Sequence, residues 1–138
     1  MFAYGQTGSG KSYTMFGYGS NKGVVPVAAE KIFEKISANT DPDITFQVSV
    51  YMVEIYMEKI QDLLIPKEKR GAPLQIREKN KDIYVEGVSI KPVKDYAAIQ
   101  QWISIGDKNR SIDATAMNKT SSRSHTVFTI EILKITTF

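Results

Sequence analysis

The apolar residues of this chain recur with two periods, one typical of helices and one typical of strands. A helical run begins near Pro26, a residue that suits a first helical turn, and ends before the polar stretch 39–43. Its apolar face, which we expect to lie in the core, consists of Val25, Ala29, Ile32, Phe33 and Ile36. Residues 44–57 alternate at first and then become apolar on both sides, which predicts a strand that enters a sheet covered on both faces.

Shorter elements follow in the second half of the chain. Residues 74–78 and 83–93 predict strands around a basic turn, with interruptions at Pro73, Gly87 and Pro92. Asp95 suits the N-cap of a further helix, which local rules would end at Gly106. The residues that this helix should bury are Ile99, Trp102 and Ile103. Residues 126–135 predict a final strand, and strands separated by helices indicate an α/β fold with a mixed sheet.

A glycine-rich run near the start of the chain has the spacing of a phosphate-binding loop: a glycine, four residues, Gly-Lys and a hydroxyl residue. It consists of Gly5, Gln6, Thr7, Gly8, Ser9, Gly10, Lys11 and Ser12. Glycines let successive backbone N–H groups turn inward around an anion, and we expect a side chain at Gly8 or Gly10 to collide. Residues 2–4 would end the strand before this loop. Residues 11–16 would open a helix whose positive end points at the phosphates.

This loop pattern predicts that the chain handles a nucleoside triphosphate. Lys11 would reach the β and γ phosphates, and the hydroxyl of Ser12 would ligate Mg²⁺. Residues 17–23 would follow as a flexible surface loop. The competing interpretation of the glycine run is a plain turn without a ligand.

A second polar run lies near the end of the chain, at residues 118–125, and reads Asn-Lys-Thr-Ser-Ser-Arg-Ser-His. Taken alone, such a run is typical of a solvated loop. Hydroxyl groups beside an arginine also suit a sensor of the γ-phosphate, because hydroxyls hold a metal-bound or attacking water while the arginine responds to the phosphate.

Together, residues 2–15 and the run at 118–125 closely resemble the kinesin motor domain. Residues 50–64 and 109–118 look like the same family, so the resemblance spans the whole chain. It implies a P-loop NTPase of the α/β class, with an incomplete kinesin-like mixed central sheet flanked by helices. It also implies an ATPase that moves along microtubules. Against the local signal, it carries the helix after Asp95 through Gly106 toward Ile112.

The resemblance assigns roles to single residues. Tyr13 would lie against the adenine base, or else pack on the core as an ordinary helix residue. Ser121 and Ser122 look like the switch I hydroxyls, one near the attacking water and the other near Mg²⁺; Ser122 joins Ser12 as a metal ligand, with the order of the two serines left open. The catalytic set is Lys11, Ser121, Ser122 and Arg123.

The resemblance also assigns Asn118 to the nucleotide-binding group, beside residues 5–13, and gives roles to Arg123 and His125. Arg123 resembles the family arginine that pairs with a carboxylate of a second switch, which would follow residue 138. Asn118 would help to position switch I at the nucleotide. His125, the single histidine of the chain, would support this motif rather than act as a general base.

Composition adds a candidate partner surface. The net charge is only +3, yet residues 67–81 contain six basic residues against two acidic ones. Such a basic segment is either a solvated loop or a contact for an acidic partner, and the resemblance makes that partner the microtubule. We expect no nucleic-acid partner, because no aromatic residues interleave with the lysines. The absence of cysteine, of a signal peptide and of a long apolar run favours a cytoplasmic, cytoskeletal protein without membrane insertion.

The resemblance also predicts that residues 1–138 are a partial motor domain, from the phosphate loop through switch I, because a kinesin-like domain needs more than twice this length. The adenine motif would precede residue 1. Taken alone, the piece should be inactive and should fold poorly. One alternative is a non-hydrolysing kinesin-like module that binds nucleotide or microtubules. Another is an unrelated phosphate-loop ATPase or kinase, which the run at 118–125 disfavours.

Overall fold

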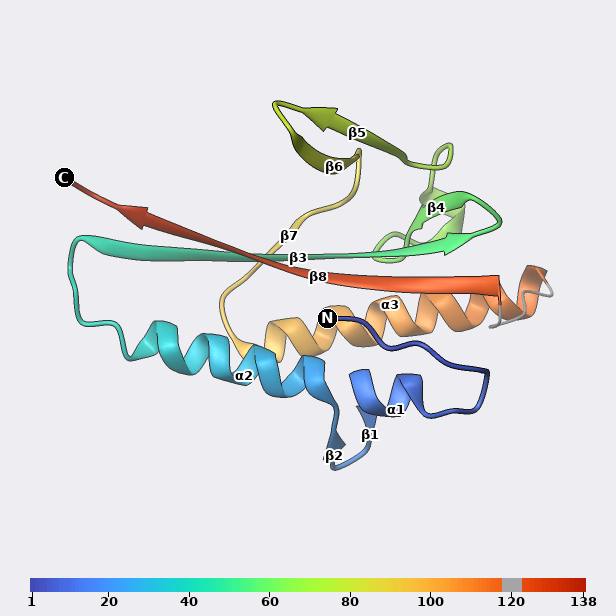
Figure 1. Ribbon diagram of the computed structural model, residues 1–138, viewed down its shortest axis with the longest axis horizontal. Coiled ribbons are helices and arrows are strands. Elements are labelled where there is room, and N and C mark those ends of the chain that lie inside the picture. The colour runs from blue at the N-terminus through green and yellow to red at the C-terminus, as the bar shows by residue number, and fades with distance from the viewer. Residues whose placement is uncertain (118–122) are drawn as a thin grey trace.

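The computed structural model describes residues 1–117 and 123–138. Its centre is a pair of long antiparallel strands, β3 (Ile44–Tyr56) and β8 (Ser124–Thr136), which are paired along their whole length (Figure 1). On the other edge of β3, β4 (Lys59–Asp62) pairs with its end and β7 (Lys91–Val93) with its middle. All pairings among the described strands are antiparallel, so the parallel member of the expected mixed sheet is not among them.

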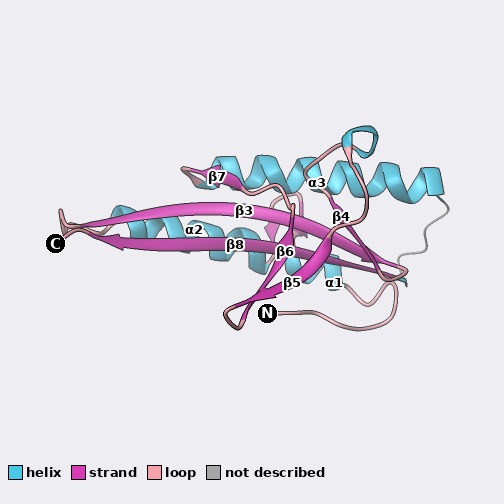
Figure 2. Ribbon diagram, turned by 90° about the horizontal axis from the view of Figure 1, so that it is seen from above, coloured by secondary structure: helices cyan, strands magenta, loops and turns pink. Residues whose placement is uncertain are grey.

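The helices α1 (Lys11–Met15), α2 (Val24–Ser37) and α3 (Tyr96–Met117) all lie on one face of this sheet (Figures 1 and 2). The alternation of β3 sends every second side chain toward them. The buried core between sheet and helices consists of Ala29, Val48, Val50, Val93 and Ile99, and a second cluster contains Met52, Leu63 and Leu64. The described helices therefore do not provide the cover on both faces that we expected from residues 44–57.

Helix α3 continues through the glycine at which local rules would end it. A β-carbon at Gly106 would lie only 2.2 Å from the sulfur of Met52 on β3, so the glycine allows the helix to approach the sheet closely. The extension toward Ile112 is confirmed. At its start, the carboxylate of Asp95 accepts a hydrogen bond of 2.8 Å from the backbone N–H of Ala98, as the predicted N-cap requires.

A separate hairpin stands on the side of the sheet opposite to the helices (Figure 1). It consists of β5 (Gln75–Lys79) and β6 (Asp82–Glu86), joined by Asn80 and Lys81, which both have positive φ as a tight two-residue turn requires. A short 3₁₀ helix, η1 (Lys67–Lys69), precedes it. We call residues 67–86 the lobe. The predicted strand 83–93 is divided at Gly87 into β6 and β7.

Two predictions near the start of the chain are wrong. Residues 2–4 form no strand, because no described strand pairs with their backbone, and Phe2 and Tyr4 are 83% and 87% exposed. Residues 17–23 are not simply a flexible loop but contain a small hairpin, β1 (Gly17–Tyr18) and β2 (Asn21–Lys22). The positive φ of Gly17 and Gly19 makes this turn possible.

Candidate functional site

The predicted phosphate loop is an exposed turn that leads into α1. Gly5, Gly8 and Gly10 all have positive φ, at 153°, 83° and 93°. A β-carbon at Gly8 or Gly10 would meet no protein atom within 4 Å, so the collision that we expected is not with the chain itself. Glycine is needed at these two positions because other residues rarely adopt such backbone angles.

The side chain of Lys11 folds back into the loop. Its ammonium donates hydrogen bonds to the carbonyl oxygens of Gly5, at 2.5 Å, and Gln6, at 2.9 Å. The backbone N–H of Ser9 also donates to Gln6, at 3.1 Å. No carboxylate of the described residues pairs with Lys11. The loop therefore presents one positive charge that an anion can neutralise.

A cavity of about 320 Å³ opens beside this lysine. Its lining consists of Phe2, Ala3, Tyr4, Ser9, Gly10, Lys11 and Thr14. The following helix, α1, has only five residues, so its dipole adds little to the positive charge that Lys11 presents at the loop. The predicted helix start at Lys11 is confirmed.

Tyr13 projects from α1 into solvent. Its side chain is 52% exposed, and its ring lies 6.0 Å from the ring of Tyr18, so the alternative that it packs on the core is wrong. An exposed ring beside a phosphate loop has the accessibility that stacking on a flat base requires.

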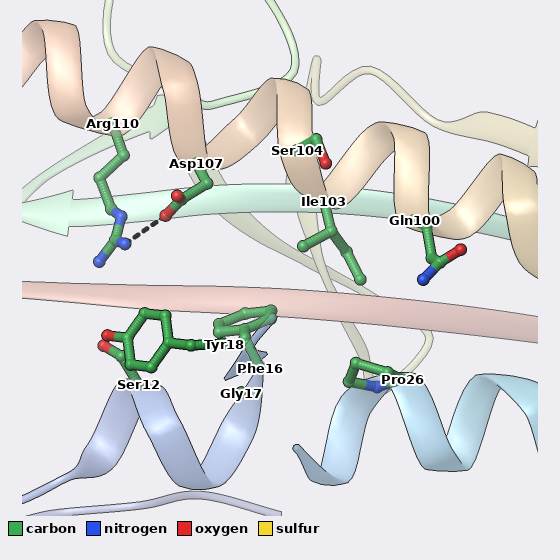
Figure 3. Close-up of a pocket in the computed structure, with 10 residues that line it drawn as sticks. All are labelled: Ser12, Phe16, Gly17, Tyr18, Pro26, Gln100, Ile103, Ser104, Asp107 and Arg110. Carbon is green, nitrogen blue, oxygen red and sulfur yellow. Dashed lines mark hydrogen bonds and ion pairs between the residues drawn. The ribbon is translucent and has the colours of Figure 1, made fainter. Parts of the chain in front are cut away.

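Figure 3 shows a second cavity, of about 240 Å³, between α1, the start of α2 and α3. It is lined by Ser12, Phe16, Gly17, Tyr18, Pro26, Gln100, Ile103, Ser104, Asp107 and Arg110. Arg110 forms an ion pair with Asp107 and extends from α3 toward Ser12. The Nε of Arg110 is buried and has no hydrogen-bond partner among the described residues. Ser12 of α1 thus lines this second cavity, whereas its neighbour Lys11 lines the first.

The second motif is only partly described. Asn118, Ser121 and Ser122 lie outside the described residues, so their roles stay predictions. Arg123 is exposed, and its predicted role stays a prediction. His125 is exposed on β8 and lies opposite Ile55 of β3, and its supporting role in the motif stays a prediction.

Sequence reasoning missed a buried ion pair between the lobe and α3, and a separate buried carboxylate at the end of β4. Arg70 and Asp113 form an ion pair of 2.5 Å, with their side chains only 7% and 2% exposed. Asp62 is also buried, and its carboxylate accepts hydrogen bonds from the backbone N–H groups of Leu64, at 2.9 Å, and Ser89, at 2.7 Å. No sequence signal marks this ion pair, because the position of Asp113 on the sheet-facing side of α3, seven residues after Gly106, follows only from the contact of Gly106 with Met52.

The exposed charge of the lobe is smaller than its composition indicates. Arg70 is neutralised by Asp113, and Arg77 pairs with Glu86 at 2.9 Å, a hydrogen bond that raises the pKa of the Arg77 guanidinium above its ordinary value. The exposed lysines are Lys67, Lys69, Lys79 and Lys81, and the exposed carboxylates Glu68, Glu78 and Asp82 lie among them. Beside them, Ile76, Ile83 and Tyr84 expose 58%, 74% and 44% of their surface. The lobe therefore offers lysines together with apolar side chains.

Comparisons with known proteins agree with one another. The family model described as kinesin motor domain matches residues 1–137. The human kinesin-like protein KIF14 is 43% identical over 134 residues, and KIF1B of Rattus norvegicus is 47% identical over 133 residues. Each alignment covers 94% of this chain, but only 8% and 7% of the respective relative. The chain thus spans less than a tenth of the length of these relatives.

Solved structures give the same result. A structure described as a fast kinesin has a TM-score of 0.89 and 40% identity, and the match covers 96% of this chain and 38% of that one. A KIF14 dimer with AMP-PNP in complex with a microtubule has a TM-score of 0.82 and 43% identity, with coverage of 96% and 37%. A KIF14 complex with ADP and a microtubule also matches, at a TM-score of 0.82 and 42% identity over 98% and 38%.

Proposed function

The chain belongs to the kinesin motor-domain family, and from that membership we propose that the protein containing it is an ATP-hydrolysing motor that moves along microtubules. One observation carries the proposal. Lys11, which no described carboxylate neutralises, lies inside a loop whose three glycines have positive φ. This is the arrangement that a triphosphate needs. The relatives with AMP-PNP and ADP support it.

Binding of ATP would require Lys11 to exchange its present partners. The ammonium would leave the carbonyl oxygens of Gly5 and Gln6 and hold the β and γ phosphates as a point charge. Backbone N–H groups of residues 5–12 would surround the phosphates, and Tyr13 would stack on the adenine. The half-buried Ser12 and, from switch I, Ser122 offer hydroxyl oxygens suited to Mg²⁺, which when bound neutralises phosphate charge.

Hydrolysis would need a positioned water rather than a covalent nucleophile, and Ser121, Ser122 and Arg123 are our candidates for holding it and sensing the γ-phosphate. Asn118 would position this switch. Loss of the γ-phosphate would release the segment and so couple chemistry to movement.

The track contact that we propose is the lobe, through its exposed lysines and apolar side chains. The resemblance implies that the lobe contacts the acidic surface of tubulin, and the relatives in complex with microtubules support such a partner. The protein would accordingly be found on the cytoskeleton. No helix in the described part of the chain is long and apolar enough to cross a membrane.

The test is Lys11→Ala in the complete motor domain. Removing one charge contact to the transferred phosphate should cost on the order of 3 kcal/mol, or a loss of turnover of about a hundredfold or more. Steady-state ATP hydrolysis is measured with and without microtubules, and Lys31→Ala on α2 serves as a control that keeps the same change of side chain away from the loop. If Lys11→Ala turns over ATP within a few-fold of the unaltered domain, the assignment fails.

A further inference from the structure

The hairpin of the lobe buries none of its side chains in the described part of the chain. Every residue of β5 is exposed, and so is every residue of β6 except Val85, which is only partly buried. The ion pair of Arg77 with Glu86 joins β5 to β6 and attaches the hairpin to nothing else. The direction in which the hairpin projects from the sheet (Figure 1) must therefore be set at its base.

Asp62, the last residue of β4, lies at that base and is 4% exposed. Its two carboxylate oxygens accept hydrogen bonds from two different segments. One accepts from the backbone N–H of Leu64 at 2.9 Å, in the segment that enters the lobe. The other accepts from the backbone N–H of Ser89 at 2.7 Å, in the segment that leaves it. A single side chain therefore ties both ends of the lobe to the edge of the sheet.

These two bonds hold a carboxylate that has no other described partner. Asp62 forms no ion pair with a described residue, and a buried carboxylate that loses its donors is costly. Neither segment can leave it without leaving an oxygen unsatisfied. Beside it on β4, the carbonyl oxygen of Ile60 accepts a hydrogen bond of 2.9 Å from the backbone N–H of Leu74, just before β5 begins. The short strand β4 is thus the mount of the lobe.

From this arrangement we propose that Asp62 is a positioning residue for the contact of the lobe with the microtubule. Its buried carboxylate does not touch the track but fixes the direction in which the hairpin is presented to it. Association costs less when the binding segment already has its bound direction, so a lobe held at both ends binds more tightly than one that swings. The inference rests on the proposed function, which makes the lobe a track contact. It predicts that Asp62 affects microtubule affinity and leaves nucleotide binding unchanged.

The test uses the complete motor domain and Asp62→Asn, which keeps the shape of the side chain but replaces one acceptor oxygen with an amide group that cannot accept. Microtubule affinity is measured by co-sedimentation with AMP-PNP, and the affinity for a fluorescent ATP analogue is measured without microtubules. We expect microtubule affinity to fall about tenfold, because fewer lobes have the binding direction, and nucleotide affinity to stay within about twofold.

Asp41→Asn is the matched control. The carboxylate of Asp41 also accepts a bond from the backbone N–H two residues farther along, that of Asp43, at 3.0 Å, but this turn lies outside the lobe. The same chemical change should leave microtubule affinity as it is in the unaltered domain.

A double-mutant cycle separates the presentation of the lobe from general damage to the fold. Lys79→Glu with Lys81→Glu removes the charged contact of the hairpin, so adding Asp62→Asn to that variant should weaken microtubule affinity by less than about threefold. General damage would instead give the same loss in both backgrounds. Hydrogen exchange is an independent readout, because Asp62→Asn should speed the exchange of the amides of Leu64 and Ser89 while those of β3 stay protected.

A second variant keeps the test decisive if Asp62→Asn does not fold. Ser89→Pro removes the same bond from the donor side, because proline has no N–H, and should give the same loss of microtubule affinity. Unchanged affinity in either folded variant, or an equal loss in both backgrounds of the cycle, would overturn the positioning role. An unaltered domain that binds no microtubules would instead refute the proposed motor function.

Discussion

Replacing Gly106 with alanine probes the contact that brings α3 onto the sheet. The added methyl group would lie 2.2 Å from the sulfur of Met52 and 3.5 Å from a methyl carbon of Leu64, whereas carbon atoms pack at roughly 3.5–4.0 Å. Met52 is 1% exposed, so its side chain has little room to retreat. Overpacking of a core costs about 1–3 kcal/mol, and alanine returns roughly 0.5–1 kcal/mol through its better helix propensity. We expect a net loss of about 1–2 kcal/mol.

Denaturant unfolding of the complete motor domain measures this loss. The control is Gly71→Ala, because a β-carbon at Gly71 meets no atom within 4 Å, and it should change the free energy of unfolding by less than about 0.5 kcal/mol. In a background that carries Met52→Ala, the same Gly106→Ala change should become neutral or stabilising, since the obstructing sulfur is gone. If Gly106→Ala is equally destabilising in both backgrounds, the steric explanation is wrong.

Two further predictions concern the lobe and the isolated chain. Lys79→Glu with Lys81→Glu should weaken microtubule binding of the complete domain at low salt. The loss of affinity should shrink as salt rises, because exposed charges are screened within about 10 Å at 0.1 M. Lys31→Glu with Lys35→Glu on α2 is the matched control, and equal losses of affinity in both variants would argue against the lobe. Residues 1–138 alone should show neither a cooperative thermal transition by circular dichroism nor microtubule-stimulated hydrolysis, and the observation of both would contradict the expectation of a partial domain.

Local pattern predicted most of the secondary structure. The apolar spacing after Pro26 predicted α2, and the alternation from Ile44 predicted β3, because both elements have one side on the core. Gly106 shows where local reasoning fails: the residue breaks an isolated helix, but in the fold it contacts Met52, 54 positions away in the sequence. Only the family resemblance contained that information.

The backbone geometry of the phosphate loop was predictable because the motif defines it. The positive φ of Gly8 and Gly10 and the position of Lys11 agree with the loop pattern. The partner of Arg70 was not predictable, because a count of charges treats each basic residue as exposed. The ion pair with Asp113 forms only when the segment after β4 returns to α3, which is a property of tertiary packing.

The position of β8 at an edge of the sheet affects how residues 1–138 behave as a separate polypeptide. In the described part of the chain, all thirteen residues of β8 pair with β3, and no strand pairs with its other edge. Such an edge exposes a row of backbone donors and acceptors to which a strand of another molecule can add. Glu131 and Lys134 are its only charged residues, and Val127, Ile132 and Leu133 expose 42%, 49% and 57% of their surface. Concentrated solutions of the separated chain will therefore favour self-association by intermolecular sheet growth along β8.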